Sequence, residues 1–471
     1  MNRRILLLIL FLLSVPTFLP AQSVDSTQAR KISVQPARSS AEWVRHGVIY
    51  EVYLRSFSPE GNFAGLEKRL PELNRLGVTI LWLMPIHPVG VVKRKGTLGS
   101  PYSVQDYYAV SPEFGTMDDF KKLLSKAHAL GFHLIIDLVV NHTAWDSRLM
   151  KEHPEWFTKD GAGNIIPPNP DWSDVADLDY SKPELRRYMI GMMKYWVREV
   201  GIDGFGCELA EMVPTDFWES AHTALDSIRP VMMLSEGSYP EHHLKAFDVT
   251  YSWNIYHLLS PIMNGEKTAR SINIELSREE VTFPKGSLRM RFSSNHNENA
   301  WDAPDVDKFG IAGAKLSAVL VNTLPGIPLL YNGQEVGNRK KLGLFEKTSI
   351  DWTGGEEFTA LYSRLFELRK YQPAFSAGEM VRISTTNDKR VYAFARVADA
   401  NKFLVACNFD ADTFAGSLDL ASPGLSVDKQ ITMTDVFTKR TTTLAVPPSK
   451  AIPIEVPAMG FRILQIEQLS H

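Results

Sequence analysis

Cysteine is scarce in this sequence. Only Cys207 and Cys407 occur among 471 residues, and 200 positions separate them. A disulfide framework is therefore excluded, and two free, buried thiols are a better prediction than one long-range disulfide. The short Cys and His spacings that are typical of metal-binding motifs are also absent, so the spacing predicts no zinc site.

The sequence also has little excess of one charge over the other. The formal net charge is −3 and no long basic run occurs, so a nucleic-acid partner is not expected. With 44% hydrophobic and 22% charged residues, the composition is ordinary for a soluble globular protein. Since single cores stop growing near ~250–300 residues, the length predicts one large domain and a smaller one.

Long apolar runs are missing except at the N-terminus, where ILLLILFLL follows MNRR. That run is far shorter than the ~18–20 residues of a membrane span, and the small residue Ala21 follows it as a cleavage site. We therefore predict a cleaved secretory signal peptide over residues 1–21 rather than a membrane anchor. No cysteine lies near the cleavage point, so no lipid anchor is expected, and the location is expected to be secreted or periplasmic. Residues 22–43 are predicted to be a flexible leader.

From Gly47 onward, apolar β-rich runs alternate with helical patterns, which is typical of a parallel sheet. The predicted strands are continuously apolar and end in polar clusters, which favours a (β/α)8 barrel over an open sheet. Seven strands are identified directly, at residues 48–57, 78–86, 132–140, 202–209, 231–237, 288–295 and 327–333.

The pattern changes after about residue 375. Short alternating strands separated by turns follow, which predicts an antiparallel β-sandwich. We expect a barrel domain over residues 44–374, with an irregular insert at about 142–180, and a β-sandwich domain over residues 375–471.

Four polar clusters stand at the ends of predicted strands. One such cluster is usually only a turn or a helix cap, but four on one barrel predict a site, because the carboxyl ends of barrel strands meet at one mouth. The clusters are DLVVNH (137–142), DGFGCELA (203–210), LSEGSYP (234–240) and FSSNHNENAW (292–301).

These clusters match, in order, the four short motifs of the α-amylase family, glycoside hydrolase family 13. The sequence resembles that family over roughly residues 44–471, and PGIPLLYNGQEVG (325–337) agrees with it. The resemblance implies a secreted protein that acts on maltodextrin or other α-1,4-linked glucans. It implies no required cofactor.

The family's chemistry implies roles for individual residues. Glu236 matches the general acid/base, and Tyr102 matches the aromatic residue that stacks on the sugar. Asp137, His142 and His296 match other polar groups that bind the sugar. Asn141 stands where many members bind calcium, but Met212, four residues past the nucleophile position, is a poor ligand for a hard cation. Calcium binding is therefore expected to be weak.

Three positions depart from the motifs. Glu208 stands where the family has its nucleophilic Asp, Gly206 where it has an arginine, and Asn297 where it has the Asp that stabilises the transition state. A misplacement of about 1 Å can cost ~100-fold in rate, and a neutral amide binds a developing charge less well than a carboxylate. The formal charge of the cluster is nevertheless unchanged, because one positive and one negative group are lost together.

Two hypotheses follow. The first is an active retaining α-glucan hydrolase with Glu208 as nucleophile and Glu236 as acid/base. The second, which the three departures favour, is a catalytically impaired protein that binds glucan on the same scaffold. Under the second, changing positions 206, 208 and 297 together to Arg, Asp and Asp is expected to restore turnover, and each single change to recover little.

Overall fold

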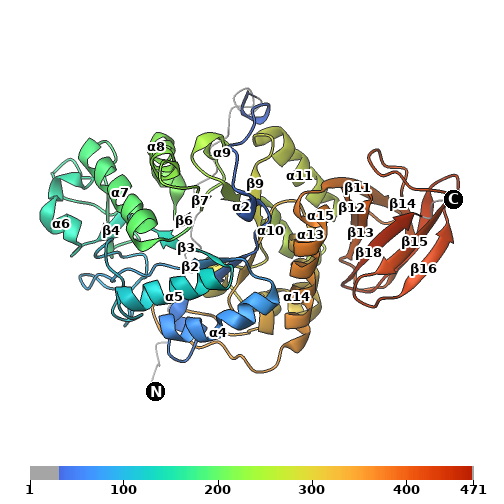
Figure 1. Ribbon diagram of the computed structural model, residues 1–471, viewed down its shortest axis with the longest axis horizontal. Helices are drawn as coiled ribbons and strands as arrows, with labels where there is room; N and C mark the ends of the chain where they lie inside the picture. The colour runs from blue at the N-terminus through green and yellow to red at the C-terminus, as the bar shows by residue number, and fades with distance from the viewer. Residues whose placement is uncertain (1–30, 469–471) are drawn as a thin grey trace, which may run out of the picture.

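The computed structural model describes residues 31–468 of the chain (Figure 1). The predicted signal peptide lies outside the described residues. Within them, no helix is both long and apolar enough to cross a membrane. Cys207 and Cys407 are buried and free, as predicted.

Eight parallel strands close into a barrel in the order β1-β10-β9-β8-β7-β6-β3-β2. Nearly every residue of these strands is buried, because the barrel interior faces one side and the helices cover the other. The predicted barrel is confirmed. The strands are β1 (Ile49–Val52), β2 (Ile80–Leu83), β3 (His133–Leu138), β6 (Gly204–Cys207), β7 (Met232–Ser235), β8 (Val249–Tyr251), β9 (Leu288–Arg291) and β10 (Ile327–Tyr331).

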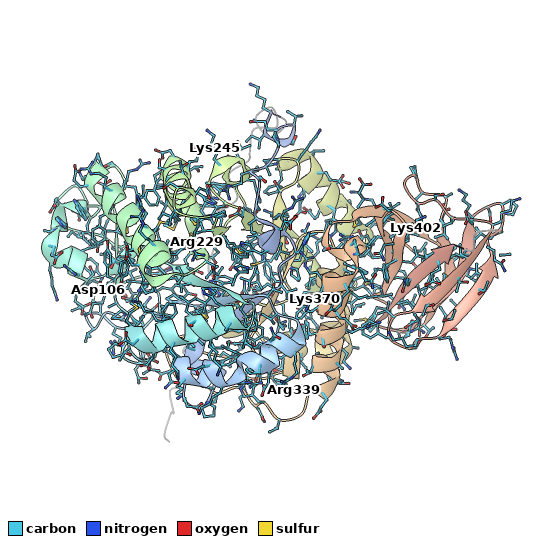
Figure 2. All side chains as sticks on the ribbon, viewed as in Figure 1. Asp106, Arg229, Lys245, Arg339, Lys370 and Lys402 are labelled. Carbon is cyan, nitrogen blue, oxygen red and sulfur yellow. The ribbon has the colours of Figure 1, made fainter. Side chains whose placement is uncertain are left out.

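Helices surround the barrel, and side chains fill the space inside it and between the layers (Figures 1 and 2). Their ends follow local sequence signals. Thr116 and Asp119 form a capping box at the start of α5, and α4 ends at Gly77, whose φ of 99° suits glycine. The longer helices are α4 (Phe63–Leu76), α5 (Met117–Ala129), α7 (Pro183–Tyr195), α8 (Thr215–Asp226), α10 (Trp253–Met263), α11 (Arg270–Thr282), α13 (Asp305–Thr323) and α14 (Glu356–Tyr371). The short ones are α2 (Glu42–Arg45), α3 (Leu54–Phe57), α9 (His242–Lys245), α12 (His296–Trp301), α15 (Pro373–Ser376), η2 (Trp196–Val200), η3 (Ala210–Met212) and η4 (Gln334–Val336).

Two predicted strands differ from the structure. The run at 48–57 was expected to be one strand, but β1 ends at Val52 and a helical turn, α3, follows it. The sixth barrel strand, β8, was not identified from the sequence. It is three residues long, too short for a periodic pattern to show.

The segment between β3 and α7 contains the predicted insert. It carries a two-stranded antiparallel sheet of β4 (His142–Ala144) and β5 (Val175–Asp177), with α6 (Arg148–Glu152) and η1 (Pro154–Trp156) between them. This arrangement holds His142 at the barrel mouth.

The leader prediction needs a correction for residues 31–43. Ala37 N–H donates to the carbonyl of Lys285 over 2.8 Å, and Lys285 N–H donates to that of Gln35 over 2.9 Å. Arg38 forms ion pairs with Asp226 and Asp248. These contacts dock this part of the leader on the barrel, because its polar backbone finds partners there.

The C-terminal residues form an antiparallel sheet beside α13 and α15 (Figure 1). Its eight strands follow the order β16-β15-β18-β13-β12-β11-β14-β17, and the sheet curls into a half-barrel in which β17 contacts β13 and β18 around an apolar core. The predicted antiparallel C-terminal sheet is confirmed. The other face shares the main core with the barrel helices. The strands are β11 (Glu379–Thr385), β12 (Val391–Ala398), β13 (Asn401–Asn408), β14 (Phe414–Asp419), β15 (Gln430–Asp435), β16 (Thr441–Ala445), β17 (Ala451–Val456) and β18 (Gly460–Gln468).

Candidate active site

Four barrel strands bring the predicted site residues to one mouth. Asp137 lies on β3 and pairs in register with Gly206 on β6, while Glu208 and Glu236 follow the ends of β6 and β7. His296 begins the short helix after β9. Gly204, at the start of β6, has a φ of 152°, and a Cβ there would lie 2.0 Å from the carbonyl oxygen of Met232. Only glycine allows β6 and β7 to approach in this way.

The two glutamates and the histidine converge. One ligand atom each of Glu208, Glu236 and His296 lie within 4.8 Å of one another. His296 Nε2 is 3.9 Å from Glu208 Oε1. Since a carboxyl oxygen of Glu208 lies within 4.8 Å of one of Glu236, the two glutamates are about as close as the ~5–5.5 Å that separates the carboxyls of a retaining glycosidase.

Glu236 is held by two donors. Asn297 Nδ2 donates to Glu236 Oε1 over 3.2 Å, and the Leu209 N–H donates to Glu236 Oε2 over 3.0 Å. Leu209 adopts the left-handed conformation, with φ 47° and ψ 41°, which costs a side-chain-bearing residue about 1 kcal/mol or more. That strained turn aims the N–H at Glu236.

Tyr102 and His142 line the mouth from the loop after β2 and from the insert. His142 Nε2 donates to the Tyr102 carbonyl over 3.1 Å, and burial lowers the pKa of His142 to about 4, so its ring is neutral at pH 7. The Tyr102 ring lies 5.8 Å from the ring of His296, and its hydroxyl is buried without a hydrogen-bond partner. All seven candidate catalytic and substrate-binding residues therefore lie around one mouth.

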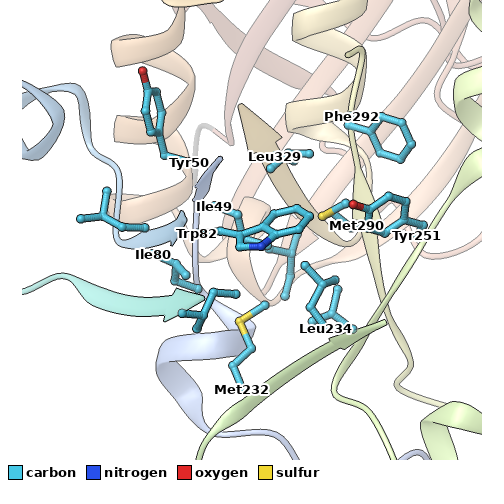
Figure 3. Close-up of a cluster of buried hydrophobic side chains, with 14 of the residues drawn as sticks. Ile49, Tyr50, Ile80, Trp82, Met232, Leu234, Tyr251, Met290, Phe292 and Leu329 are labelled. Atoms are coloured by element: carbon cyan, nitrogen blue, oxygen red, sulfur yellow. The ribbon is translucent and has the colours of Figure 1, made fainter. Parts of the chain in front are cut away.

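Gly206 faces the indole of Trp82, which comes from β2. A Cβ at position 206 would lie 2.4 Å from Trp82 Nε1 and 2.6 Å from Trp82 Cε2. The space into which a side chain at position 206 would extend is thus filled, and an arginine can enter only if Trp82 moves. Figure 3 shows this indole at the centre of the barrel among Ile49, Leu234, Met290 and Leu329.

Glu208 and Asp137 form a buried acidic pair. Burial, and then the charges of Asp137 and Glu236, raises the pKa of Glu208 well above its usual value. Burial likewise raises the pKa of Asp137, against the opposing charge of His296. Hydrogen bonding with Glu236 and with Asp137 raises the pKa of Glu208 further. The protonated form of Glu208 is therefore more favoured than that of an exposed glutamate.

His296 is oriented by Glu51, a residue that sequence analysis did not select. His296 Nδ1 hydrogen-bonds to Glu51 Oε1, and both side chains are fully buried. Burial alone would lower the pKa of His296, but the Glu51 carboxylate outweighs it and the pKa lies above its usual value. Glu51 is the only charged residue among residues 48–51, at the start of the apolar run at 48–57. A charge within an apolar strand is the signal that could have identified it.

Asn141 and its neighbour Met212, at the expected calcium position, do not suit that ion. Asn141 Nδ2 lies 3.8 Å from the Met212 sulfur, and only Asn141 Oδ1 remains buried without a partner. A hard cation needs several oxygen ligands, and a thioether supplies none. Weak calcium binding therefore stays a prediction.

Comparison with known proteins gives a consistent result. The family model "Alpha amylase, catalytic domain" matches residues 19–360. The chain is 27% identical over 421 residues to Alpha-amylase MalA of Haloarcula japonica, covering 84% of this chain and 60% of that protein, so it spans about three fifths of that relative. Alpha-amylase 3 of Dictyoglomus thermophilum is 27% identical over 447 residues, covering 78% of this chain and 85% of that protein.

Solved structures agree in fold and length. A noncanonic maltogenic alpha-amylase, AmyB, from Thermotoga neapolitana superposes with a TM-score of 0.84 at 34% identity, covering 90% of this chain and all of that one. An alpha-amylase from Lactobacillus plantarum superposes with a TM-score of 0.78 at 30% identity, with the same coverage.

Proposed function

This chain belongs to the alpha-amylase family, and from that premise we propose that it binds α-1,4-linked glucans at the barrel mouth and hydrolyses them very slowly or not at all. The relatives named above are alpha-amylases, one of them maltogenic, which supports an α-glucan as the ligand.

The observation that carries the proposal is the surroundings of Glu208. A glycosidase nucleophile attacks as a carboxylate, and the family's arginine would keep it ionised. Here the indole of Trp82 occupies that space, and Glu208 faces Asp137 and Glu236. A carboxyl whose protonated form is favoured is a poor nucleophile, so we expect the first chemical step to be slow.

The contacts of Glu236 support the same proposal. A general acid must present a proton to the leaving oxygen, whereas both oxygens of Glu236 already accept hydrogen bonds. Asn297 supplies one of those bonds and offers no negative charge to an oxocarbenium-like transition state.

Aromatic and polar side chains that suit a sugar lie at the mouth. Tyr102 is partly exposed at the mouth, and His142 is a buried polar group beside it. The Trp172 ring lies 6.0 Å from the His142 ring. Trp301, on α12, is 60% exposed. Aromatic faces with polar neighbours suit pyranose rings, which are apolar on their faces and polar at their edges.

The test measures binding and hydrolysis on the same preparation. We expect calorimetry to detect binding of a maltooligosaccharide, and reducing-sugar release to stay near the level of buffer. Tyr102→Ala should weaken binding about threefold to tenfold through lost stacking. Tyr371→Ala, which changes an exposed tyrosine on α14, is the matched control and should bind as the wild type does.

Two results would contradict the proposal. Absence of glucan binding would remove its first half. Robust hydrolysis that Glu208→Gln abolishes would show that Glu208 is a working nucleophile, which is the alternative of an active retaining hydrolase.

A further inference from the structure

The barrel mouth concentrates acidic groups. Glu51, Asp137 and Glu208 are buried, and Glu236 is partly buried beside them. In the part of the chain that the structure describes, His296 is the only basic side chain that forms an ion pair with any of the four carboxyls. Buried negative charge of this density needs protons or a cation to neutralise it.

Three buried polar atoms in this cluster have no hydrogen-bond partner. They are His296 Nε2, Glu208 Oε1 and Asp137 Oδ2, on side chains that are at least nine-tenths buried. Buried polar groups are nearly always satisfied, so an unpaired nitrogen beside unpaired carboxyl oxygens indicates a missing ligand. A metal ion would satisfy His296 Nε2 and Glu208 Oε1 together, since a deprotonated imidazole nitrogen and a carboxylate oxygen are both electron-pair donors.

Glu51 gives His296 the orientation that a metal ligand needs. The carboxyl of Glu51 accepts from the Nδ1–H of His296, which leaves Nε2 as the free donor atom facing Glu208. This carboxylate–histidine pairing is the usual way in which proteins fix the tautomer and direction of a metal-binding histidine.

We propose that the mouth of the barrel binds one divalent transition-metal ion of the Zn²⁺ type, through His296 Nε2 and one carboxylate oxygen each of Glu208 and Glu236. The mixed imidazole and carboxylate set suits Zn²⁺ better than Mg²⁺ or Ca²⁺, which prefer oxygen alone. Asp137, on the neighbouring strand β3, adds its charge to the same cluster. Asn297 and Tyr102, beside these ligands, are partly exposed, so water can reach the mouth.

The spacing is compatible with such an ion after a small adjustment. The three ligand atoms lie within 4.8 Å of one another. Bond lengths of about 2.0–2.2 Å require each atom to move inward by less than about 1 Å, within the reach of side-chain rotation. Because a metal binds its ligands in their deprotonated forms, binding of Zn²⁺ is expected to release protons.

Gly206 is what makes the site available to a cation. An arginine at this position would bring a permanent positive charge into contact with the carboxyl of residue 208 and repel a metal ion. With glycine and Trp82 in its place, His296 is the positive partner of these carboxyls, and no other is found among the described residues.

The experiment uses the full chain after dialysis against EDTA, with no glucan present, so its outcome is independent of the proposed function. Calorimetric titration with ZnSO4 should give one site per chain, and Zn²⁺ should raise the melting temperature while Mg²⁺ does not. Co²⁺ in place of Zn²⁺ should produce visible absorption bands of a four-coordinate nitrogen and oxygen site.

Variants separate this site from surface binding. Glu208→Gln and His296→Gln should each weaken Zn²⁺ binding at least tenfold, and Glu51→Gln should weaken it 10- to 100-fold by releasing the histidine. His46→Gln and Glu60→Gln, both exposed, are the matched controls and should leave binding unchanged. Circular dichroism identifies any variant that fails to fold.

The proposal is wrong if the wild-type chain binds no Zn²⁺. It is equally wrong if binding persists unchanged in folded Glu208→Gln or His296→Gln, because the ion would then sit elsewhere. Should those variants not fold, the Co²⁺ spectrum of the wild type decides, since purely octahedral bands would contradict the site.

Discussion

The barrel contains buried carboxyl groups in two regions, and the two are balanced in opposite ways. Between α11 and β9, Glu279 accepts from Arg291 Nη1 and Nη2 over 2.9 and 2.6 Å, and Arg289 lies 3.3 Å away. At the mouth, no arginine within residues 31–468 forms an ion pair with Glu208 or Asp137. Between α11 and β9 two arginines balance one carboxylate, whereas at the mouth the carboxyls are balanced by His296 and by raised pKa values.

The pKa shifts of the two regions point in opposite directions. Burial alone would raise the pKa of Glu279, but Arg291 and Arg289 outweigh it and lower the pKa to about 2. The stability it contributes is therefore present above its unfolded pKa of 4.5 and lost as pH falls toward 2. For Glu208, whose pKa is raised by burial and by Asp137, the contribution is full below its unfolded pKa and lost as pH rises.

The largest expected effect is in the arginine-paired region. Glu279→Gln leaves two buried guanidinium groups without a negative partner, so it should lower the free energy of unfolding by about 3–5 kcal/mol at pH 7. Urea unfolding measures this. Glu280→Gln is the control on the same helix, because the Glu280 side chain is 63% exposed, and it should shift the midpoint little. A loss of less than 1 kcal/mol for Glu279→Gln would contradict the role given to the arginines.

Placing an arginine at position 206 tests whether the mouth tolerates the carboxylate–arginine pairing found between α11 and β9. Gly206→Arg should lower the free energy of unfolding by about 1–3 kcal/mol, because the new side chain overlaps Trp82. Combined with Trp82→Leu, its cost should be smaller than the sum of the two single changes. Gly191→Arg, at an exposed helical glycine with nothing within 4 Å of a Cβ, is the control and should be neutral or slightly stabilising.

The same overlap bears on the restoration of turnover. The triple change of positions 206, 208 and 297 places an arginine against the indole, so it should recover less hydrolysis than the triple change together with Trp82→Leu. Equal initial rates on a maltooligosaccharide would show that Trp82 moves without cost.

Glu208→Gln should stabilise the metal-free protein at high pH, by up to about 2 kcal/mol at pH 8. The amide removes a group whose ionisation the buried pocket resists, and the gain should shrink as pH falls to 4. Urea unfolding at both pH values, with EDTA present, measures it. A gain that grows toward acid would have the wrong sign for a carboxyl with a raised pKa.

The smallest expected effect concerns Asn297. Asn297→Asp replaces the amide that donates to Glu236 with a like charge, which should cost about 0.5–1 kcal/mol at pH 8 and little at pH 4. The effect is modest because both side chains are partly exposed. Thermal unfolding at the two pH values is sufficient to detect it, and a loss independent of pH would indicate lost packing instead.

The sequence predicted most of the barrel and the residues at its mouth. Strand and helix patterns are local, so β2, β3, β6 and β7 could be located from apolar runs and the polar clusters that end them. The strand β8 could not, because three residues carry no period. The predicted leader was wrong over residues 31–43 because its contacts, such as Arg38 with Asp248, join segments 210 positions apart.

The sequence by itself determined the family, the placement of Glu208, Glu236 and Asn297 at strand ends, and the absence of an arginine at position 206. Only the tertiary structure decided what stands in place of that arginine. Barrel closure brings Trp82 against Gly206, and it brings Glu51 against His296 across 245 positions. Charge compensation depends on distances through space between side chains from different strands, and no spacing along the chain encodes those distances.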